Sequence, residues 1–271
     1  MNFTRDEFRL RDISARAIVR HITVHPGQTR ADLIARLALP RSTVISLVHR
    51  LLHDGWLMER EGAWARQRGR RSAELHLRPD RLMLLGVELG VQGVRAVAIS
   101  LTGEMLAEAA CEHGENPTAT GALDTAVRLL LDIRKRSERQ DHQVAGIGIG
   151  VPGPVDEASG CTSGVPALGW GPLAVARLVK ERLRGLPLEE APLYVQNDVE
   201  VAAAGEREFG ARPSGDIALG AAAFARHRIV QPFKEPTRLP TLVARYGRRY
   251  NAPAVIEEPA RPREPAVEAI C

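Results

Sequence analysis

The stretch that most constrains the fold runs from Thr29 to Gly55, with the sequence TRADLIARLALPRSTVISLVHRLLHDG. Thr29 precedes a short helical pattern and has Asp32 three residues on, a variant of the capping box that starts helices. Leu39-Pro40 then turns the chain, and the proline suits a helix start because its missing N–H is not needed there. Gly55 can adopt the left-handed conformation that ends the second helix. The stretch therefore predicts two short helices joined by a tight turn.

The second of these helices has two distinct faces. Its apolar residues recur at i, i+3, i+4 and i+7, which predicts a buried stripe: Val44, Leu47, Val48 and Leu51. Hydroxyl, His and Arg side chains are left on the outward face, where hydroxyls can reach phosphate or base edges and Arg can fork onto guanine. The candidate DNA-binding residues in this stretch are Thr29, Arg41, Ser42, Thr43, Ser46, His49 and Arg50.

The flanking sequence completes the outline of a winged helix-turn-helix. Residues 13–24 predict a first helix that ends at His25-Pro26-Gly27, and its expected apolar face is formed by Ile13, Ala17, Ile18 and Ile22. Trp56 to Met58 and Ala73 to Leu77 predict the two strands of a hairpin. Its tip is basic and suits contact with the DNA backbone or the minor groove. The candidate residues at the tip are Arg68, Gly69, Arg70 and Arg71.

Charge is distributed unevenly along the chain. Residues 1–80 carry 15 Arg and 9 acidic residues, a net charge of +6, whereas residues 81–271 carry a net charge of −2. Binding to phosphates favours such a local excess of positive charge. Taken singly, a basic loop can be merely solvated, and helical hairpins occur in unrelated folds. A helix pair followed by a basic hairpin, together with the local charge excess, favours a DNA reader.

The length of 271 residues suits about two domains, and 44% hydrophobic residues suffice for a buried core. The three cysteines, Cys111, Cys161 and Cys271, are too far apart in sequence to suggest a clustered metal site. We find no signal-peptide pattern and no apolar run near the ~18 residues that suggest a membrane span. The expected location is therefore cytoplasmic, without membrane association and with reduced thiols.

Beyond Arg78-Pro79-Asp80 the pattern changes to that of a mixed α/β sheet. The strands expected here are 83–88, 94–100, 105–109, 144–151 and 193–196, and the expected helices are 120–138, 172–184 and 199–209. The glycines of the strand VAGIGIGV (144–151) allow a neighbouring element to approach closely.

Asn197 and Asp198 lie at the C-terminal end of an expected strand, where ligands bind in α/β sheets. Asp198 could accept a hydroxyl proton or hydrogen-bond a sugar. It could equally be the N-cap of the following helix. The residues alone leave both roles open.

Several motifs together resemble the ROK family of repressors and sugar kinases, in its xylose- or N-acetylglucosamine-repressor-like branch. The resemblance spans about residues 13–217 and rests on SLVHRLLHDGWLMEREG with RGRRS, LLGVELGVQGVRAVAISLTGEML, GIGIGVPGPVD, LGWGPL and VQNDVEVAAAGEREFG. It implies an α+β winged helix-turn-helix domain (1–79) followed by an actin-like, ribonuclease H-like α/β sugar-kinase-type domain (80–219). It also implies sugar binding at Gly153, Asn197 and Asp198.

Departures from the family pattern argue against catalysis. The family's kinases have Asp-x-Gly-Gly-Thr-Lys as first phosphate loop, where this chain has Glu88, Gly90, Val91, Gln92 and Gly93. The hydroxyl and the cation of that loop are thus lost, so we expect no phosphate cradle and no enzyme activity. In the wing, Arg71 replaces the proline of the family's Gly-Arg-Pro, which softens the loop and adds charge.

The sequence after about Leu219 lacks the family's second phosphate loop, its Glu-x-Gly-His segment and its zinc-binding cysteine cluster. We therefore expect an incomplete kinase-like domain with no zinc and no other cofactor. Residues 220–271 are rich in Pro and Arg without a sustained helical or strand period, which predicts a disordered or poorly packed tail. Our hypothesis is that the reading frame shifted near residues 217–221.

The function expected from these features is that of a DNA-binding transcriptional repressor of sugar-utilisation genes. Its expected partners are a double-stranded DNA operator, a sugar or sugar-phosphate effector and a second copy of the chain in a homodimer. Two alternatives remain open at this point. One is a ROK-type sugar kinase with an accessory domain, and the other is a truncated product without function.

Overall fold

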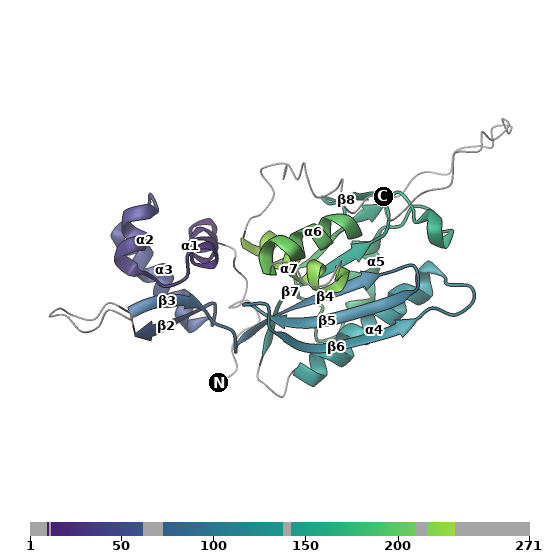
Figure 1. The fold of residues 1–271 in the computed structure, drawn as a ribbon, viewed down its shortest axis with the longest axis horizontal. Helices are drawn as coiled ribbons and strands as arrows, with labels where there is room; N and C mark the ends of the chain where they lie inside the picture. The colour runs from purple at the N-terminus through teal and green to yellow at the C-terminus, as the bar shows by residue number, and fades with distance from the viewer. Residues whose placement is uncertain (1–9, 11, 62–72, 138–141, 210–215, 231–271) are drawn as a thin grey trace.

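The computed structural model describes residue 10 and residues 12–61, 73–137, 142–209 and 216–230. These residues form an N-terminal module (residues 12–77) and a larger lobe (residues 82–230) that lie side by side (Figure 1). The candidate residues at the hairpin tip, Arg68, Gly69, Arg70 and Arg71, lie outside the described residues.

The N-terminal module contains three helices and a small sheet. Its elements are α1 (Ile13–Val24), β1 (Gln28–Thr29), α2 (Arg30–Arg36), α3 (Arg41–His53), β2 (Leu57–Glu61) and β3 (Ala73–Leu77). The strands pair antiparallel in the order β1-β3-β2. The expected helix pair with its turn and the expected hairpin are thus both present, and the two-residue strand β1 is an addition that the sequence did not predict.

Helix α1 starts where Asp12 accepts hydrogen bonds from the backbone N–H groups of Ser14 (2.8 Å) and Ala15 (3.1 Å). Its buried residues are Ala15, Ile18, Val19 and Ile22. The expectation that Ile13 belongs to this face was wrong, because its side chain is 78% exposed. Ile13 lies nine residues before Ile22, and at 100° per residue that spacing places the two on opposite sides of the helix.

The ends of α2 and α3 confirm the expected local signals. Thr29 and Asp32 form the capping box, with the Thr29 N–H donating to the Asp32 carboxylate at 2.8 Å. Gly55 has φ +79°, its N–H donates to the Leu52 carbonyl, and the Trp56 N–H donates to the Leu51 carbonyl. These two bonds form the Schellman motif that ends α3.

The lobe is built on a five-stranded mixed sheet with strand order β10-β7-β4-β5-β6. Its elements are β4 (Leu82–Leu89), β5 (Gly93–Ser100), β6 (Met105–Glu112), α4 (Ala119–Ser137), β7 (Gln143–Val151), β8 (Val155–Asp156), β9 (Cys161–Thr162), the 3₁₀ helix η2 (Pro166–Leu168), α5 (Val175–Leu183), β10 (Leu193–Asn197), α6 (Asp198–Phe209) and α7 (Ile217–Val230). Strands β4 to β6 form an antiparallel meander, and β7 and β10 continue the sheet in parallel. This topology is compatible with the expected ribonuclease H-like sheet.

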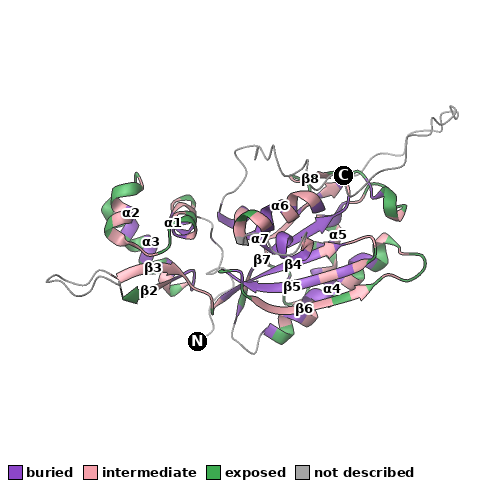
Figure 2. Ribbon diagram, in the orientation of Figure 1, coloured by how far each residue is buried: buried purple, intermediate pink, exposed green. Residues whose placement is uncertain are grey.

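One face of the sheet is covered by α4 and α5, whose apolar residues follow a helical period. Leu123, Leu130 and Ile133 of α4 pack there in one cluster with Ile147 and Ile149 of β7. The central strands are buried along their length, whereas the edge strand β6 alternates between partly buried and exposed residues (Figure 2).

The other face of the sheet is covered by α7, so the expected poorly packed tail was wrong for residues 220–230. Twelve of the 14 residues of this helix are buried. Its backbone lies directly on the sheet: a Cβ atom at Gly86 would meet the Ala218 carbonyl oxygen at 1.9 Å, and one at Gly148 would meet that of Ala221 at 1.8 Å. The glycines of β7 therefore do permit the expected close approach, and α7 is the element that uses it. Because α7 is apolar on nearly all sides, it has no amphipathic period that a sequence pattern could reveal.

The module and the α7 side of the lobe share a hydrophobic core. A single cluster contains Ile18 and Ile22 of α1 together with Leu84 of β4 and Ala222 and Ile229 of α7. The expected boundary at residue 219 therefore falls inside a packed helix. Among the described helices, none combines the length and hydrophobicity needed to cross a bilayer.

Candidate functional site

The outward face of α3 presents most of the candidate DNA-binding side chains. Arg41, Ser42, Ser46 and His49 are exposed, and Thr43 is half-buried. Val44, Leu47, Val48 and Leu51 hold the opposite face in the core, as expected. Because this buried face fixes the rotation of the helix, the polar stripe points away from the module.

Ile45 also belongs to this stripe, although it was not among the candidates. Its side chain is 43% exposed. It lies three residues after Ser42 and four before His49, so the three share one helical face. An exposed apolar side chain in such a stripe can contact a thymine methyl group. The available signal was that Ile45 does not fit the period of the buried residues.

Two candidates are already engaged within the module. The Thr29 hydroxyl lies 2.7 Å from the Asp32 carboxylate, and this contact is the main reason that the pKa of Asp32 is lowered. The Arg50 guanidinium donates to Asp12 at 3.1 Å. That exposed pair is worth about 0.2–1 kcal/mol, so a DNA phosphate can compete for Arg50. Thr29 is structural in this conformation, because its hydroxyl closes the start of α2.

The candidate sugar-binding residues meet at the C-terminal ends of β7 and β10. The side-chain amide of Asn197 donates to the carbonyl of Gly153 at 2.6 Å, which joins two of the three candidates across 44 residues. Gly153 has φ +116°, and a Cβ there would meet the Gly164 carbonyl oxygen at 2.4 Å. Glycine is therefore required at this position by both conformation and space.

Asp198 is buried beside this pair and is 5% exposed. It is the first residue of α6, so Asn197, not Asp198, occupies the N-cap position. The Val199 N–H lies 2.9 Å from the side-chain oxygens of both residues, which together close the first turn. Asp198 therefore shares the capping of α6 with Asn197, and its sugar-binding role stays a prediction.

Carboxylates and one guanidinium surround this strand end. Burial is the main cause of the raised pKa of Glu88, and the charges of Asp216 and Asp198 add to it. Arg95 donates to Asp216 at 2.5 Å and to Glu108 at 3.1 Å. Burial works against the Arg95 charge, but these hydrogen bonds outweigh it and raise the pKa of Arg95. Such a carboxylate-rich site suits hydrogen bonding to hydroxyl groups.

The aligned first phosphate loop is a short turn between β4 and β5. Its carbonyl groups are bonded to the edge of β6: the His113 N–H donates to the Gln92 carbonyl at 2.9 Å, and the His113 ring lies 3.0 Å from the Gly90 carbonyl oxygen. The nearby Arg95 is held by two carboxylates.

A chain of polar contacts leads from the sugar candidates to α7, and nothing in the sequence indicated it. The Gln196 side chain accepts from the Asn197 N–H at 2.8 Å and donates to Glu157 at 3.2 Å. Glu157 forms a buried ion pair with Arg228 of α7. Burial raises the pKa of Glu157, and the Arg228 charge opposes that rise. The strand end is thus connected to the helix that contacts the N-terminal module.

Cys111 and Cys161 are free thiols. Within the described ranges, no three His, Cys, Asp or Glu side chains are grouped so that they could hold a metal ion.

The sequence model of the ROK family matches residues 84–219. The chain belongs to the ROK family. This range contains every candidate of the strand-end site and ends inside α7.

Two curated relatives match about three quarters of the chain. The chain is 27% identical over 207 residues to the xylose repressor of Caldicellulosiruptor bescii, covering 74% of this chain and 49% of that protein. It is 22% identical over 211 residues to the xylose repressor of Bacillus subtilis, covering 78% of this chain and 53% of that protein. The chain thus spans about half the length of the curated relatives it matches.

Among solved structures, the chain is similar to a ROK family transcriptional regulator described as a homologue of the Escherichia coli MLC protein. The TM-score is 0.59 at 21% identity, over 73% of this chain and 48% of the other. This likeness supports the fold assignment of the ROK lobe.

Proposed function

We propose that residues 12–77 form a winged helix-turn-helix DNA reader and that the protein is a transcriptional repressor of sugar-utilisation genes. The observation that carries the proposal is α3, with one face fully buried and the other presenting hydroxyls, Arg41, His49 and Ile45. A helix of this kind, followed directly by a hairpin with a basic tip, matches the geometry of a major-groove reader with a wing. The tip residues Arg68, Gly69, Arg70 and Arg71 add phosphate or minor-groove contacts.

The proposed effector is a sugar or sugar phosphate, and the names of the xylose repressors favour a pentose. Asn197, Asp198 and Gly153 form its binding site, because polar side chains and a backbone carbonyl converge there on a strand end. The proposed operator is double-stranded DNA bound by a homodimer in the cytoplasm, with one α3 per half-site.

A sugar kinase is the second candidate, because Asp198 is placed where a carboxylate could accept a hydroxyl proton. Two observations weigh against it. The turn at Gly90 to Gly93 contains neither the threonine nor the lysine of the kinase loop, and the nearby Arg95 is held by Asp216 and Glu108. Without a cation on the transferred phosphate, phosphoryl transfer loses its main source of stabilisation.

The kinase-like domain is proposed to be incomplete, with a frame shift near residues 217–221 as the cause. The support is the loss of the family pattern at that point. Resequencing the gene tests it: the idea fails if the alternative frame lacks a glycine-rich loop and a cysteine cluster. The non-functional alternative predicts no specific DNA binding.

DNA binding is tested by measuring affinity for candidate operators as a function of salt. Replacing Arg68, Arg70 and Arg71 together by Ala should flatten the plot of log K against log salt by about one unit for each lost phosphate contact. The matched control removes three exposed arginines of the lobe, Arg128, Arg177 and Arg184, and should leave the slope unchanged.

A second variant tests base contact apart from charge. Ile45→Ala should reduce specific affinity about fivefold or more, since burial of each methylene group is worth about 0.8 kcal/mol. Thermal stability should not fall, because the side chain is exposed in the free protein. The proposal fails if the triple variant keeps its slope and Ile45→Ala keeps its affinity.

A further inference from the structure

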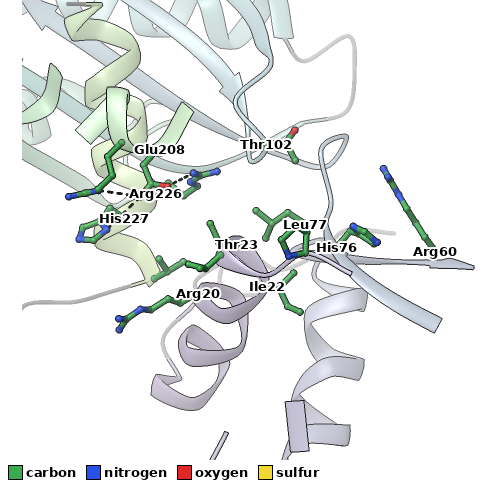
Figure 3. Close-up of a pocket in the computed structure, with 14 residues that line it drawn as sticks. Arg20, Ile22, Thr23, Arg60, His76, Leu77, Thr102, Glu208, Arg226 and His227 are labelled. Carbon is green, nitrogen blue, oxygen red and sulfur yellow. Dashed lines mark hydrogen bonds and ion pairs between the residues drawn. The ribbon is translucent and has the colours of Figure 1, made fainter. Parts of the chain in front are cut away.

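A pocket of about 670 Å³ lies at the junction of the N-terminal module and the lobe (Figure 3). The module contributes residues of α1, β2 and β3, and the lobe contributes Thr102 after β5, the end of α6 and the end of α7. This volume falls within the range of about 300–1,000 Å³ typical of small-molecule sites, which often form between domains.

The walls of the pocket carry an excess of positive charge. Four arginines line it, Arg20, Arg60, Arg207 and Arg226, and the only carboxylate among its lining residues is Glu208. Buried Arg226 forms an ion pair with Glu208 and donates to the Leu101 carbonyl at 2.5 Å. The Arg207 guanidinium lies 4.0 Å from the same carboxylate. Glu208 is therefore already engaged by the lobe.

Arg20 and Arg60 come from the module and have no such partner. Neither forms an ion pair with any carboxylate in the part of the chain that the structure describes. Their charges remain available to a molecule that enters the pocket.

His227 shows the effect of this charge on a neighbouring group. Burial is the main reason that its pKa falls to about 4; the charges of Arg207, Arg228 and Arg20 lower the pKa further, and the charge of Glu208 opposes them. At neutral pH the imidazole is therefore uncharged, and it lines the pocket as a hydrogen-bonding group. The same positive field that opposes a proton on His227 attracts an anion.

The shape of the pocket separates a charged end from an apolar middle. Figure 3 shows Arg20 near His227 and the Arg226–Glu208 pair at one end of the pocket, and Arg60 at the opposite end. Ile22 and Leu77 lie between these two ends. The Thr23 hydroxyl donates to the Val19 carbonyl at 2.8 Å and keeps its lone pairs as acceptors for a ligand hydroxyl.

We propose that this junction pocket binds a small organic phosphate. The phosphate lies at the end formed by Arg20, Arg207 and His227, and the body of the ligand lies over Ile22 and Leu77. Guanidinium groups from two separate elements suit a dianion, because charge-assisted hydrogen bonds to phosphate are strong. A neutral sugar leaves the arginine charges uncompensated and binds weakly here.

A ligand in this position touches both the DNA reader and the lobe. Its affinity therefore depends on the relative placement of the module and the lobe. If DNA binding changes that placement, the ligand and DNA alter each other's affinity by linkage. This site is separate from Asn197 and Asp198, and its existence does not depend on the proposed DNA-binding function.

The test is titration calorimetry on the full chain at fixed ionic strength. The probe is glucose 6-phosphate, with inorganic phosphate and unphosphorylated glucose compared under the same conditions. Glucose 6-phosphate should bind, and glucose should bind at least tenfold more weakly. Arg20→Ala should weaken glucose 6-phosphate binding about tenfold, the effect of losing one charge-assisted hydrogen bond. Arg128→Ala removes an equal charge from an exposed position of α4 and should leave binding unchanged.

Three results overturn the proposal. The first is that neither glucose 6-phosphate nor inorganic phosphate binds at a concentration of about 10 mM, at which even a very weak site is occupied. The second is an equal loss in the Arg20 and Arg128 variants, which indicates unspecific attraction. The third is a loss in Asn197→Ala with none in Arg20→Ala, which places the ligand at the strand end. Matching thermal melts of the Arg20 and Arg128 variants show that both are folded.

Discussion

The two faces of the five-stranded sheet are covered by helices of opposite character. On one face, α4 inserts large branched side chains such as Leu130 and Ile133 between those of the strands. On the other face, α7 places its backbone on Gly86 and Gly148, with Ala side chains filling the remaining space. The strand β7 serves both, because its isoleucines alternate with its glycines. The first face thus depends on side-chain volume and the second on the absence of side chains.

This difference predicts opposite sensitivities to mutation. The α4 face should suffer from the removal of atoms and the α7 face from their addition. A measurement on each face, with a matched control, can break or sharpen the comparison.

The largest effect is expected from Gly148→Ala. The added methyl group would lie 1.8 Å from the Ala221 carbonyl oxygen, so α7 must move away from the sheet. We expect a loss of about 3 kcal/mol or more in the free energy of unfolding, measured by urea denaturation. Gly114→Ala is the control, because a Cβ there has no neighbour within 4 Å. Equal stability of the two variants would contradict the close packing of α7.

A somewhat smaller effect is expected from Leu130→Ala on α4. The side chain is fully buried, and its truncation leaves a cavity that should cost about 2–3 kcal/mol. The same urea denaturation measures this loss. The control is Arg128→Ala, a change at an exposed residue of the same helix. If Leu130→Ala proves neutral, the α4 face does not depend on side-chain volume.

The smallest effect concerns pH and the α7 face. His227 has a folded-state pKa of about 4, below its ordinary value of 6.5, so the unfolded chain binds the proton more readily. Stability contributed by neutral His227 is therefore complete above about pH 6.5 and is lost as the pH falls toward 4. After allowance for solvent screening, we expect a loss of about 1–2 kcal/mol over this window.

The variant His227→Gln should flatten this part of the pH–stability curve. The control His53→Gln removes an exposed histidine of α3 and should leave the curve as it is. A curve that is the same for wild type and His227→Gln would show that the α7 face does not respond to this proton.

Much of the N-terminal module could be predicted because its signals are local. The period of Val44 to Leu51, the capping box at Thr29 and the left-handed Gly55 each act within a few residues. Ile13 shows the limit of local signals: it is apolar like the core residues of its helix, but its rotation relative to Ile22 turns the side chain toward solvent.

The strand-end site was predicted in part. The positions of Asn197 and Asp198 followed from strand and helix patterns, and the structure adds the bond from Asn197 to Gly153. Which of the two residues stands before the first residue of α6 could not be predicted, because a shift of one residue in the helix start decides it. The contacts through Gln196 and Glu157 to Arg228 join segments that are distant in sequence.

The sequence by itself determined the helices and the hairpin of the module, the positions of the strands along the lobe and the membership in the ROK family, because periodicity, caps and motifs are written in consecutive residues. Only the tertiary structure decided the place of α7 and the pocket between module and lobe. A helix that is apolar on nearly all sides carries no directional pattern, so its position depends on which surface can accept its backbone. Gly86 and Gly148 provide that surface.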